Sequence, residues 1–478
     1  MENLKPWERS RETPLSRSVR WAAALVTAGM CALLITHIVS RLRANGFEQF
    51  GSFYTLMITS FVFSRFFLAA IYKAPKDSGI EPTIAIIVPS YNEGEAVART
   101  IHSCVNIDYP PDKLEVVVID DGSTDDTYAH MLMAAAEYEP APSLRRLRRG
   151  DAAIDEALFS DALLADVPAP SVRCLTGPNG GKRVAMAKGI RATTAEILIF
   201  VDSDSMPAPW AIRKLVQGFA NPKVGAISGL TYVRNAETNT LTRMQAARYY
   251  ISFQLLKTAE SVVGTVSCCS GCFAAYRRAA VMPLLERWEH QQWFGMECTY
   301  GDDRSLTNMI LRNRWKAIYD AEAEAWTDAP DRYHKFFKQQ LRWKKSWARE
   351  GPILATHVWR THPVAFPAVL IATLSGLASP VVAIINVIYL PIAHGITPVF
   401  YVLCLYLMSM TYALLYRSLR SDGIWKYAIL ATFFYVSFSL QLIWAIIRIR
   451  DGSWGTRPST ASPEQEPQPD EEFELAAA

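Results

Sequence analysis

The stretch AEILIFVDSDS, residues 195–205, places a short apolar run directly before two carboxylates. Such a run, partly β-branched, is typical of a buried strand, and the polar residues mark its end. The same pattern occurs earlier in TIAIIVPS (83–90) and LEVVVIDDGS (114–123), and helix-like sequence follows the first of these. Apolar strands that alternate with helices predict an α/β fold with a mostly parallel sheet covered on both faces.

Polar clusters follow all three predicted strands, with the sequences SYNEGE, DDGSTDD and DSDS. In an open parallel sheet the carboxyl ends of the strands meet at one edge, and ligands bind outside that edge. Three independent clusters at one edge are hard to explain by chance. The sequence therefore predicts a ligand site there.

The composition excludes several classes of protein. Half of the 478 residues are hydrophobic, which is too apolar for an ordinary soluble enzyme, and a net charge of +3 gives no argument for nucleic acid as a partner. The eight cysteines are mostly scattered, which does not fit a secreted disulfide scaffold. Cys269 and Cys272 have CxxC spacing but no second pair nearby, so small side chains in a tight turn are favoured over a zinc site.

Two apolar runs precede the predicted sheet domain. Residues 19–40 are bracketed by arginines and are long enough to cross a bilayer as a helix. A signal peptide is disfavoured, because no small-residue cleavage site precedes a soluble start and a second run follows closely. That second run, 50–72, contains Arg65, which is costly at mid-membrane unless it snorkels or faces protein.

Three more apolar runs follow the sheet domain, at 365–390, 396–416 and 424–447. Both flanks of the last run, 417–423 and 448–457, contain arginines and look cytoplasmic. One straight crossing cannot place both flanks on the same side. Either the last run re-enters the membrane as a hairpin, or an upstream run splits in two.

The predicted organisation has five parts. They are a cytoplasmic N-terminal segment (1–18), two transmembrane helices (19–72), a cytoplasmic sheet domain (82–350), an interfacial helix with the C-terminal membrane region (351–447), and a final segment (448–478) that ends in a disordered acidic tail. The sheet domain contains an arginine-bearing insertion at 139–170. A solvated surface insertion is favoured there over contact with anionic lipid.

Three motifs carry the chemistry of binding. Side chains alternate along a strand, so Asp202 and Asp204 could point the same way and both could bind a hard divalent cation. GPNGGKRVAMAKG (177–189) places glycines and Lys182 ahead of a short helix, where backbone amides and a cation suit phosphate oxygens. An ordinary loop–helix junction explains this motif equally well. KQQLRWKKSWARE (338–350) fits either a diphosphate-binding helix or an amphipathic interfacial helix.

The stretch TYGDDRSLTN (299–308) contains adjacent carboxylates, Asp302 and Asp303. Taken locally, a helix cap is the better explanation, because aspartate is a preferred cap residue and suits the helix dipole. The strand-end clusters and the other motifs shift the balance. We therefore expect Asp303 to be a catalytic base, Asp302 to be its structural neighbour, and the helix to begin near Ser305.

The motifs VDSD, SGCFAAYRR, GDDRSLTN, QQLRWKKS and WGTR occur in an order that resembles the processive membrane glycosyltransferases of family two, and in particular the hyaluronan synthases. The resemblance covers residues 83–350 well and the C-terminal membrane region loosely. It implies a GT-A-like nucleotide-sugar-binding domain. Cys272 departs from the usual SGP form of its motif, which leaves the details of the acceptor pocket open.

The resemblance also implies roles for the donor-side residues. Tyr91, Glu93 and Asp121 would hold the uridine end of a nucleotide sugar, and Lys182 would contact the nucleotide or its diphosphate. Asp202 and Asp204 would bind Mg²⁺ or Mn²⁺.

Further roles follow for the acceptor side and the C-terminus. Asp303 would be the general base. The remaining substrate-binding residues implied by the motifs are Arg277, Gln339, Arg342, Trp343, Trp454 and Arg457, of which the last two would cover the nucleotide site.

The implied activity is an inverting transfer in which sugars from UDP-GlcNAc and UDP-GlcA are polymerised and the polysaccharide is exported. The implied location is the plasma membrane. Three alternatives stay open: a chitin-like homopolymer synthase, a non-processive transferase that acts on a lipid-linked acceptor, and a catalytically silent subunit. The polymer, its linkage, the direction of chain growth and the oligomeric state are not predicted.

Overall fold

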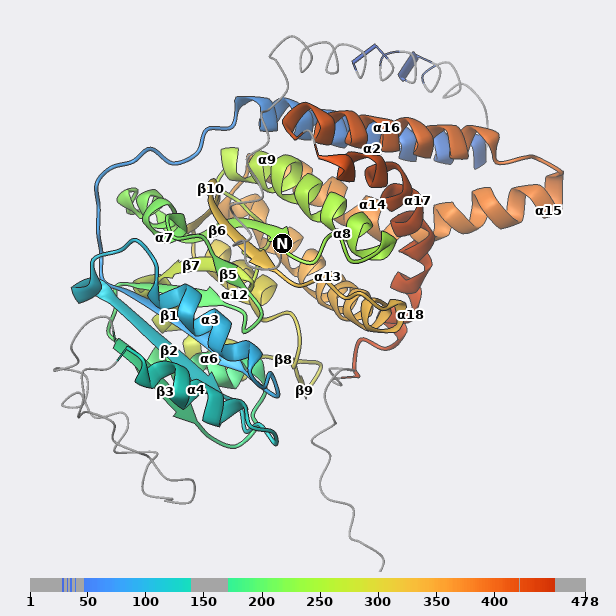
Figure 1. The fold of residues 1–478 in the computed structure, drawn as a ribbon. Helices are drawn as coiled ribbons and strands as arrows, with labels where there is room; N and C mark the ends of the chain where they lie inside the picture. Colours follow the sequence, from blue (N-terminus) through green and yellow to red (C-terminus); the bar gives the residue numbers. More distant parts are fainter. Residues whose placement is uncertain are drawn as a thin grey trace, which may run out of the picture.

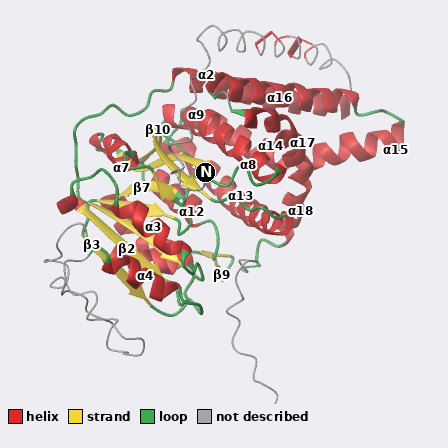
Figure 2. Cartoon of the chain, viewed as in Figure 1, coloured by secondary structure: helices red, strands yellow, loops and turns green. Residues whose placement is uncertain are grey.

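A computed structural model describes residues 47–138, 171–420 and 422–451, together with a few positions between 28 and 39. Its centre is an eight-stranded sheet (Figures 1 and 2). The strands lie in the order β3 (Ser171–Thr176), β2 (Leu114–Asp120), β1 (Ile84–Ser90), β4 (Ile197–Val201), β7 (Phe273–Arg277), β6 (Val224–Val233), β10 (Lys316–Thr327) and β5 (Met206–Pro207).

The sheet is mostly parallel, as predicted. Strands β3, β2, β1 and β4 run parallel, and β6 runs parallel to β10, whereas β7 and β5 are antiparallel to their neighbours. The three strands predicted from apolar runs are β1, β2 and β4. A separate two-stranded hairpin consists of β8 (Gln292–Trp293) and β9 (Met296–Glu297).

Helices cover both faces of the sheet, because alternate side chains of its strands are apolar in both directions. In β1, Ile84, Ile86 and Val88 belong to one buried cluster, and Ile87 belongs to the other. The first cluster lies under α3 (Ala96–Val105), α4 (Thr127–Ala136) and α7 (Ala211–Leu215). The second lies under α6 (Lys182–Arg191), α11 (Leu285–Glu289), α12 (Asp302–Arg312) and α13 (Tyr333–Thr361). The predicted domain boundary at 350 falls inside α13.

Three helices of the described residues are long and apolar enough to cross a membrane, which indicates a membrane protein. They are Phe53–Ile71 within α2 (Phe47–Ile71), Phe366–His394, and Tyr401–Leu419 within α16 (Val399–Leu419). The second comprises α14 (Phe366–Ile384), a π-helical turn and α15 (Leu390–His394). The first predicted span, 19–40, lies almost wholly outside the described residues, as do the 139–170 insertion and the tail.

The apolar run 424–447 is not one continuous helix. It is divided into α17 (Tyr427–Ser437) and α18 (Gln441–Ile447) by a 3₁₀ turn. α17 packs against α16 and against α8 (Thr240–Ile251), and α18 packs against α13. The short helices α9 (Thr258–Val262) and α10 (Arg278–Val281) complete the fold.

Arg65 faces protein, which is one of the two arrangements predicted for it. Its side chain is buried, its guanidinium lies 4.9 Å from the centre of the Phe61 ring, and its Nε donates to Ser64 Oγ at 3.3 Å. Helix α2 packs there against α9 and the π-helical turn before it. The cost of an arginine in an apolar helix is thereby reduced.

Candidate active site

The loops that follow β1, β2 and β4 meet at one edge of the sheet. Asn92 N donates to Ser123 Oγ at 2.9 Å, and Ser203 Oγ donates to Glu93 Oε1 at 2.9 Å. The first bond joins the loops after β1 and β2, and the second joins those after β1 and β4. The three polar clusters of the sequence therefore form one surface, and Tyr91 follows β1 directly into it.

Asp121 connects this edge to the glycine-rich loop at 177–181. Its Oδ1 accepts a hydrogen bond from Gly180 N at 2.9 Å, and its own N donates to Ser90 O. Gly122 has a φ of +71°, and a Cβ there would lie 2.7 Å from Asn179 N. The close approach of the two loops requires a glycine at this position.

Lys182 is the first residue of α6 and forms an ion pair with Asp202. Burial alone would lower the pKa of Lys182, but the charges of Asp202, Asp302 and Asp303 and the hydrogen bond to Asp202 outweigh it and raise that pKa. Lys182 therefore stays positively charged at the edge of the sheet, where the carboxylates of Asp202, Asp302 and Asp303 stabilise its charge.

Asp202 and Asp303 both lie close to Gly271, which belongs to the loop before β7. A Cβ on Gly271 would lie 3.3 Å from Lys182 Nζ, 3.7 Å from Asp202 Oδ1 and 3.9 Å from Asp303 Cβ. Gly271 N also donates to Asp303 Oδ2 at 3.4 Å. The structure thus brings Lys182, Asp202 and Asp303 together around one small residue.

The two adjacent aspartates separate at the start of α12. The helix begins at Asp302, not near Ser305, and its cap is Gly301 with a φ of +77°; neither carboxylate caps it. Asp302 is buried and lies 3.7 Å from an Arg183 nitrogen, whereas Asp303 faces Gly271. The expectation that one of the two carboxylates caps the helix was therefore wrong, whereas the burial of Asp302 fits the structural role expected for it.

Asp303 is fixed by its surroundings. Its Oδ1 accepts from Arg304 N at 2.7 Å, and its Oδ2 lies 3.4 Å from Cys268 Sγ. Thr307 joins the helix to the same loop, because its Oγ1 donates to Asp303 O at 2.7 Å and accepts from Cys269 N at 3.0 Å. Burial, together with Asp303, raises the pKa of the Cys268 thiol, so this sulfur stays neutral beside the carboxylate.

Asp204 lies in the turn that follows β4. Strand β4 ends at Val201, so the alternation that would have aligned the two carboxylates does not continue past it. Asp204 Oδ1 accepts from Thr327 Oγ1 at 3.0 Å, and burial with the charges of Asp202 and Glu93 raises its pKa to about 7. Among the described residues, no three His, Cys, Asp or Glu side chains form a ready metal site.

The QxxRW motif lies on α13, next to the start of α12. A Cβ on Gly301 would collide with Ser346 Oγ, so the two helices approach closely one turn after Arg342 and Trp343. Trp343 is 43% exposed, and its ring centre lies 6.0 Å from that of Tyr249. Gln339 Oε1 is buried without a hydrogen-bond partner among the described residues.

The chain that leads to the WGTR motif is anchored beside the same helices. Tyr300 OH donates to Ile449 O, and Lys345 Nζ donates to Asp451 O at 2.8 Å. Tyr300 immediately precedes Gly301 and α12. Trp454 and Arg457 lie outside the described residues, three and six positions beyond this anchor.

Arg277 is not brought to the site. It pairs with Ile197 at the beginning of β4, at the opposite end of that strand from Asp202. Its guanidinium donates to Phe219 O at 2.7 Å and its Nε donates to Val224 O at 3.1 Å. These contacts hold the backbone of the fold.

Lys257 is a residue of this region that the sequence reasoning missed. It is 8% exposed, it ends a π-helical turn (Ser252–Lys257), and its Nζ donates to Ser228 Oγ at 2.8 Å and Ser270 Oγ at 3.2 Å. Ser270 precedes Gly271. The sequence feature that could have indicated Lys257 is a single lysine within the mostly apolar run YYISFQLLKTA.

The comparisons with known proteins agree with one another. The model of glycosyl transferase family 2 matches residues 85–157, and that of glycosyltransferase like family 2 matches residues 154–346. A hyaluronan synthase of Streptococcus pyogenes serotype M3 is 28% identical over 330 residues, which cover 69% of this chain and 72% of the relative.

Two further relatives match over longer stretches. Hyaluronan synthase 1 of Xenopus tropicalis is 27% identical over 435 residues (84% of this chain, 72% of the relative), and an N-acetylglucosaminyltransferase of Azorhizobium caulinodans is 28% identical over 383 residues (80% and 89%). Among solved structures, a mannosyltransferase of Pyrobaculum calidifontis in complex with GDP-Man and Mn²⁺ has a TM-score of 0.54 at 20% identity, covering 90% of this chain and 98% of that one. The last likeness shows the GT-A-like fold.

Proposed function

Since this chain is a family 2 glycosyltransferase that resembles the hyaluronan synthases, we propose that it is a membrane-embedded, inverting, processive polymerase that uses UDP-GlcNAc and UDP-GlcA. One observation supports the mechanism: Lys182, Asp202 and Asp303 all lie within 4 Å of the position that a Cβ on Gly271 would take. An inverting transfer needs a base on one face of the sugar and a charge-stabilising group on the other, and we propose that Asp303 and the Lys182–Asp202 pair take these two roles.

In the proposed reaction, Asp303 accepts the proton of the acceptor hydroxyl as that oxygen attacks the anomeric carbon. Lys182 and Arg342 stabilise the negative charge that grows on the departing diphosphate. Gln339 and Trp343 position the diphosphate and the acceptor sugar. The fixed hydrogen bonds of Asp303 hold its carboxylate in place, which lowers the entropy cost of reaching the reactive geometry.

Tyr91, Glu93 and Asp121 bind the uridine end in this proposal. Their support is the shared surface formed by the loops after β1, β2 and β4, at the sheet edge where ligands of such folds bind. Trp454 and Arg457 cover the nucleotide. The support for this role is that Ile449 and Asp451, which precede these two residues in the chain, are anchored by Tyr300 at the start of α12 and by Lys345 on α13.

Asp202 and Asp204 would hold Mg²⁺ or Mn²⁺. Carboxylate oxygens are the ligands these cations prefer. Burial, followed by the negative charges of Asp202 and Glu93, raises the pKa of Asp204, and a divalent cation would offset the repulsion between these carboxylates. The relative from Pyrobaculum calidifontis was solved with Mn²⁺. When bound, the cation would add charge stabilisation at the diphosphate.

The membrane helices are proposed to carry the polymer out of the cell from a catalytic domain on the cytoplasmic face of the plasma membrane. A hydroxyl-rich chain cannot cross hydrocarbon unaided, because its polar groups would lose their hydrogen bonds to water. Synthesis next to a channel avoids that loss.

The test is UDP release by the purified full-length chain in lipid nanodiscs, with each donor alone and with both together, followed by sizing of the product. Release that requires both donors, with a long product, supports the proposal. Polymerisation of UDP-GlcNAc alone would establish a homopolymer synthase, an alternative that the N-acetylglucosaminyltransferase relative favours. A single added sugar would rule out processivity.

A further inference from the structure

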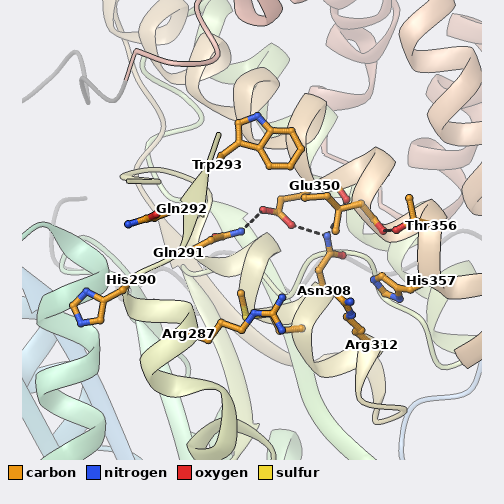
Figure 3. Close-up of a pocket in the computed structure, with 12 residues that line it drawn as sticks. Arg287, His290, Gln291, Gln292, Trp293, Asn308, Arg312, Glu350, Thr356 and His357 are labelled. Carbon is orange, nitrogen blue, oxygen red and sulfur yellow. Dashed lines mark hydrogen bonds between the residues drawn. The ribbon is translucent and has the colours of Figure 1, made fainter. Parts of the chain in front are cut away.

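A cavity of about 410 Å³ lies between α11, α12, α13 and the β8–β9 hairpin, away from the candidate active site. None of Lys182, Asp202 and Asp303 lines it. Figure 3 shows Arg287 from α11, Asn308 and Arg312 from α12, and Glu350 and His357 from α13 around the same hollow.

One wall of the cavity is a closed hydrogen-bond network. Glu350 Oε1 accepts from Gln291 Nε2 at 3.0 Å and from Arg349 Nε at 2.8 Å, and Glu350 Oε2 accepts from Asn308 Nδ2 at 2.9 Å (Figure 3). The charge of Glu350 is therefore already compensated by the protein. It does not oppose an anion in the cavity.

The rim of the cavity is cationic. Arg287 and Arg312 are exposed, and neither has a carboxylate within ion-pair distance among the described residues. A planar guanidinium presents paired donors that match the oxygens of a phosphate or carboxylate. Because both guanidinium groups, those of Arg287 and Arg312, line the same cavity, they suit a ligand with one anionic end.

The interior of the cavity has polar atoms with no protein partner. Asn308 is 3% exposed, and its Oδ1 is a buried acceptor without a hydrogen bond among the described residues. The indole donor Trp293 Nε1 and both ring nitrogens of His357 are likewise buried without a hydrogen-bond partner there. Burial and the nearby charges of Arg312 and His362 lower the pKa of His357 to about 4, so its ring is neutral and both donates and accepts. Buried polar atoms without partners are costly, and hydroxyl groups would satisfy them.

We propose that this cavity is a second binding site, which takes a monosaccharide bearing one anionic group, either a phosphate or a carboxylate. The anion binds Arg287 and Arg312 at the rim, and the sugar hydroxyls bind Asn308, Trp293 and His357 inside. The volume falls within the usual range of small-ligand pockets, roughly 300–1,000 Å³. Its walls include α12, whose second residue is Asp303, and α13, which contains QxxRW, so a bound ligand would contact both helices.

Binding is measured by equilibrium dialysis on the full-length chain in nanodiscs, with saturating UDP present to fill the donor site. The probes are radiolabelled glucose 1-phosphate, glucuronate, glucose and inorganic phosphate. We expect saturable binding of at least one of the two anionic sugars, and the tighter of them identifies the anion. The proposal is overturned if neither binds at millimolar concentration in the presence of UDP, or if glucose or phosphate alone binds equally well.

Variants then locate the site. Arg287→Gln and Arg312→Gln alter exposed side chains and should each weaken binding about tenfold, the loss of one charge-assisted contact. Arg314→Gln is the matched control, because Arg314 is exposed at the same end of α12 and does not line the cavity. UDP binding, measured in parallel, should be unchanged in all three. Equal weakening by the control variant, or none by the rim variants, would overturn the assignment.

Discussion

Replacing Gly271 with alanine should abolish most of the transferase activity without harming the fold. The added methyl group would lie 3.3 Å from Lys182 Nζ, 3.7 Å from Asp202 Oδ1 and 3.9 Å from Asp303 Cβ. The last two distances are ordinary van der Waals contacts, and the first requires only that the flexible end of Lys182 move by a few tenths of an ångström. The methyl group therefore fits the empty protein, but it occupies the space between the base and the Lys182–Asp202 pair.

A displacement of about 1 Å in a reacting group can cost roughly 100-fold in rate, so we expect a fall of at least that size in kcat. UDP release in nanodiscs measures the rate, and the thermal unfolding midpoint should stay within about 2 °C of the parent value. Gly423→Ala is the control, because a Cβ there meets no atom within 4 Å. Full activity of the Gly271 variant would refute the placement of the reacting sugar between Asp202 and Asp303.

Three further predictions concern single side chains. Asp303→Asn should lower kcat about 10²–10⁴-fold while UDP affinity, measured by dialysis, is unchanged; retained activity would exclude Asp303 as the base. Lys257→Met should lower kcat about tenfold or more and Lys257→Arg should recover part of it, because the buried cation holds Ser270 beside Gly271; equal rates in the two variants would contradict this positioning role. Burial raises the pKa of Asp320 to about 6. The folded protein therefore retains a proton that the unfolded chain loses near pH 4. As a result, this group lowers the free energy of unfolding as the pH rises from about 4 to 6. Asp320→Asn should therefore raise the unfolding midpoint at pH 7–8 and leave it unchanged at pH 4, and a uniform shift at both pH values would disprove the assignment.

The local patterns of the sequence predicted the parallel half of the sheet well. Buried strands need apolar residues on both faces, so β1, β2 and β4 are visible as continuous runs, and the polar clusters after them meet because parallel strands end at one edge. Arg277 shows the limit of the same reasoning. It is the last residue of β7, and because β7 is antiparallel to β4, the end of β7 lies at the edge of the sheet opposite the site.

Other features depended on chain geometry that no short pattern records. Asp202 and Asp204 lie beyond the end of β4, so the alternation of side chains along a strand does not determine how these two carboxylates point. The start of α12 depends on the left-handed conformation of Gly301 and its close approach to Ser346, a contact between residues 45 positions apart in the sequence. Lys257 is placed by a π-helical turn that apolar periodicity does not reveal.

The burial of Arg65 has a consequence for how the chain enters the membrane during synthesis. Its cover comes from the π-helical turn at Ser252–Lys257 and from α9, which includes Glu260, and these leave the ribosome almost 200 residues after α2. Until then, α2 carries an unshielded arginine, which costs about 2.5–3.5 kcal/mol at the centre of a helix inserted by the translocon. Before that point α2 is therefore only a provisional membrane segment, which becomes stable when the π-helical turn and α9 pack against it.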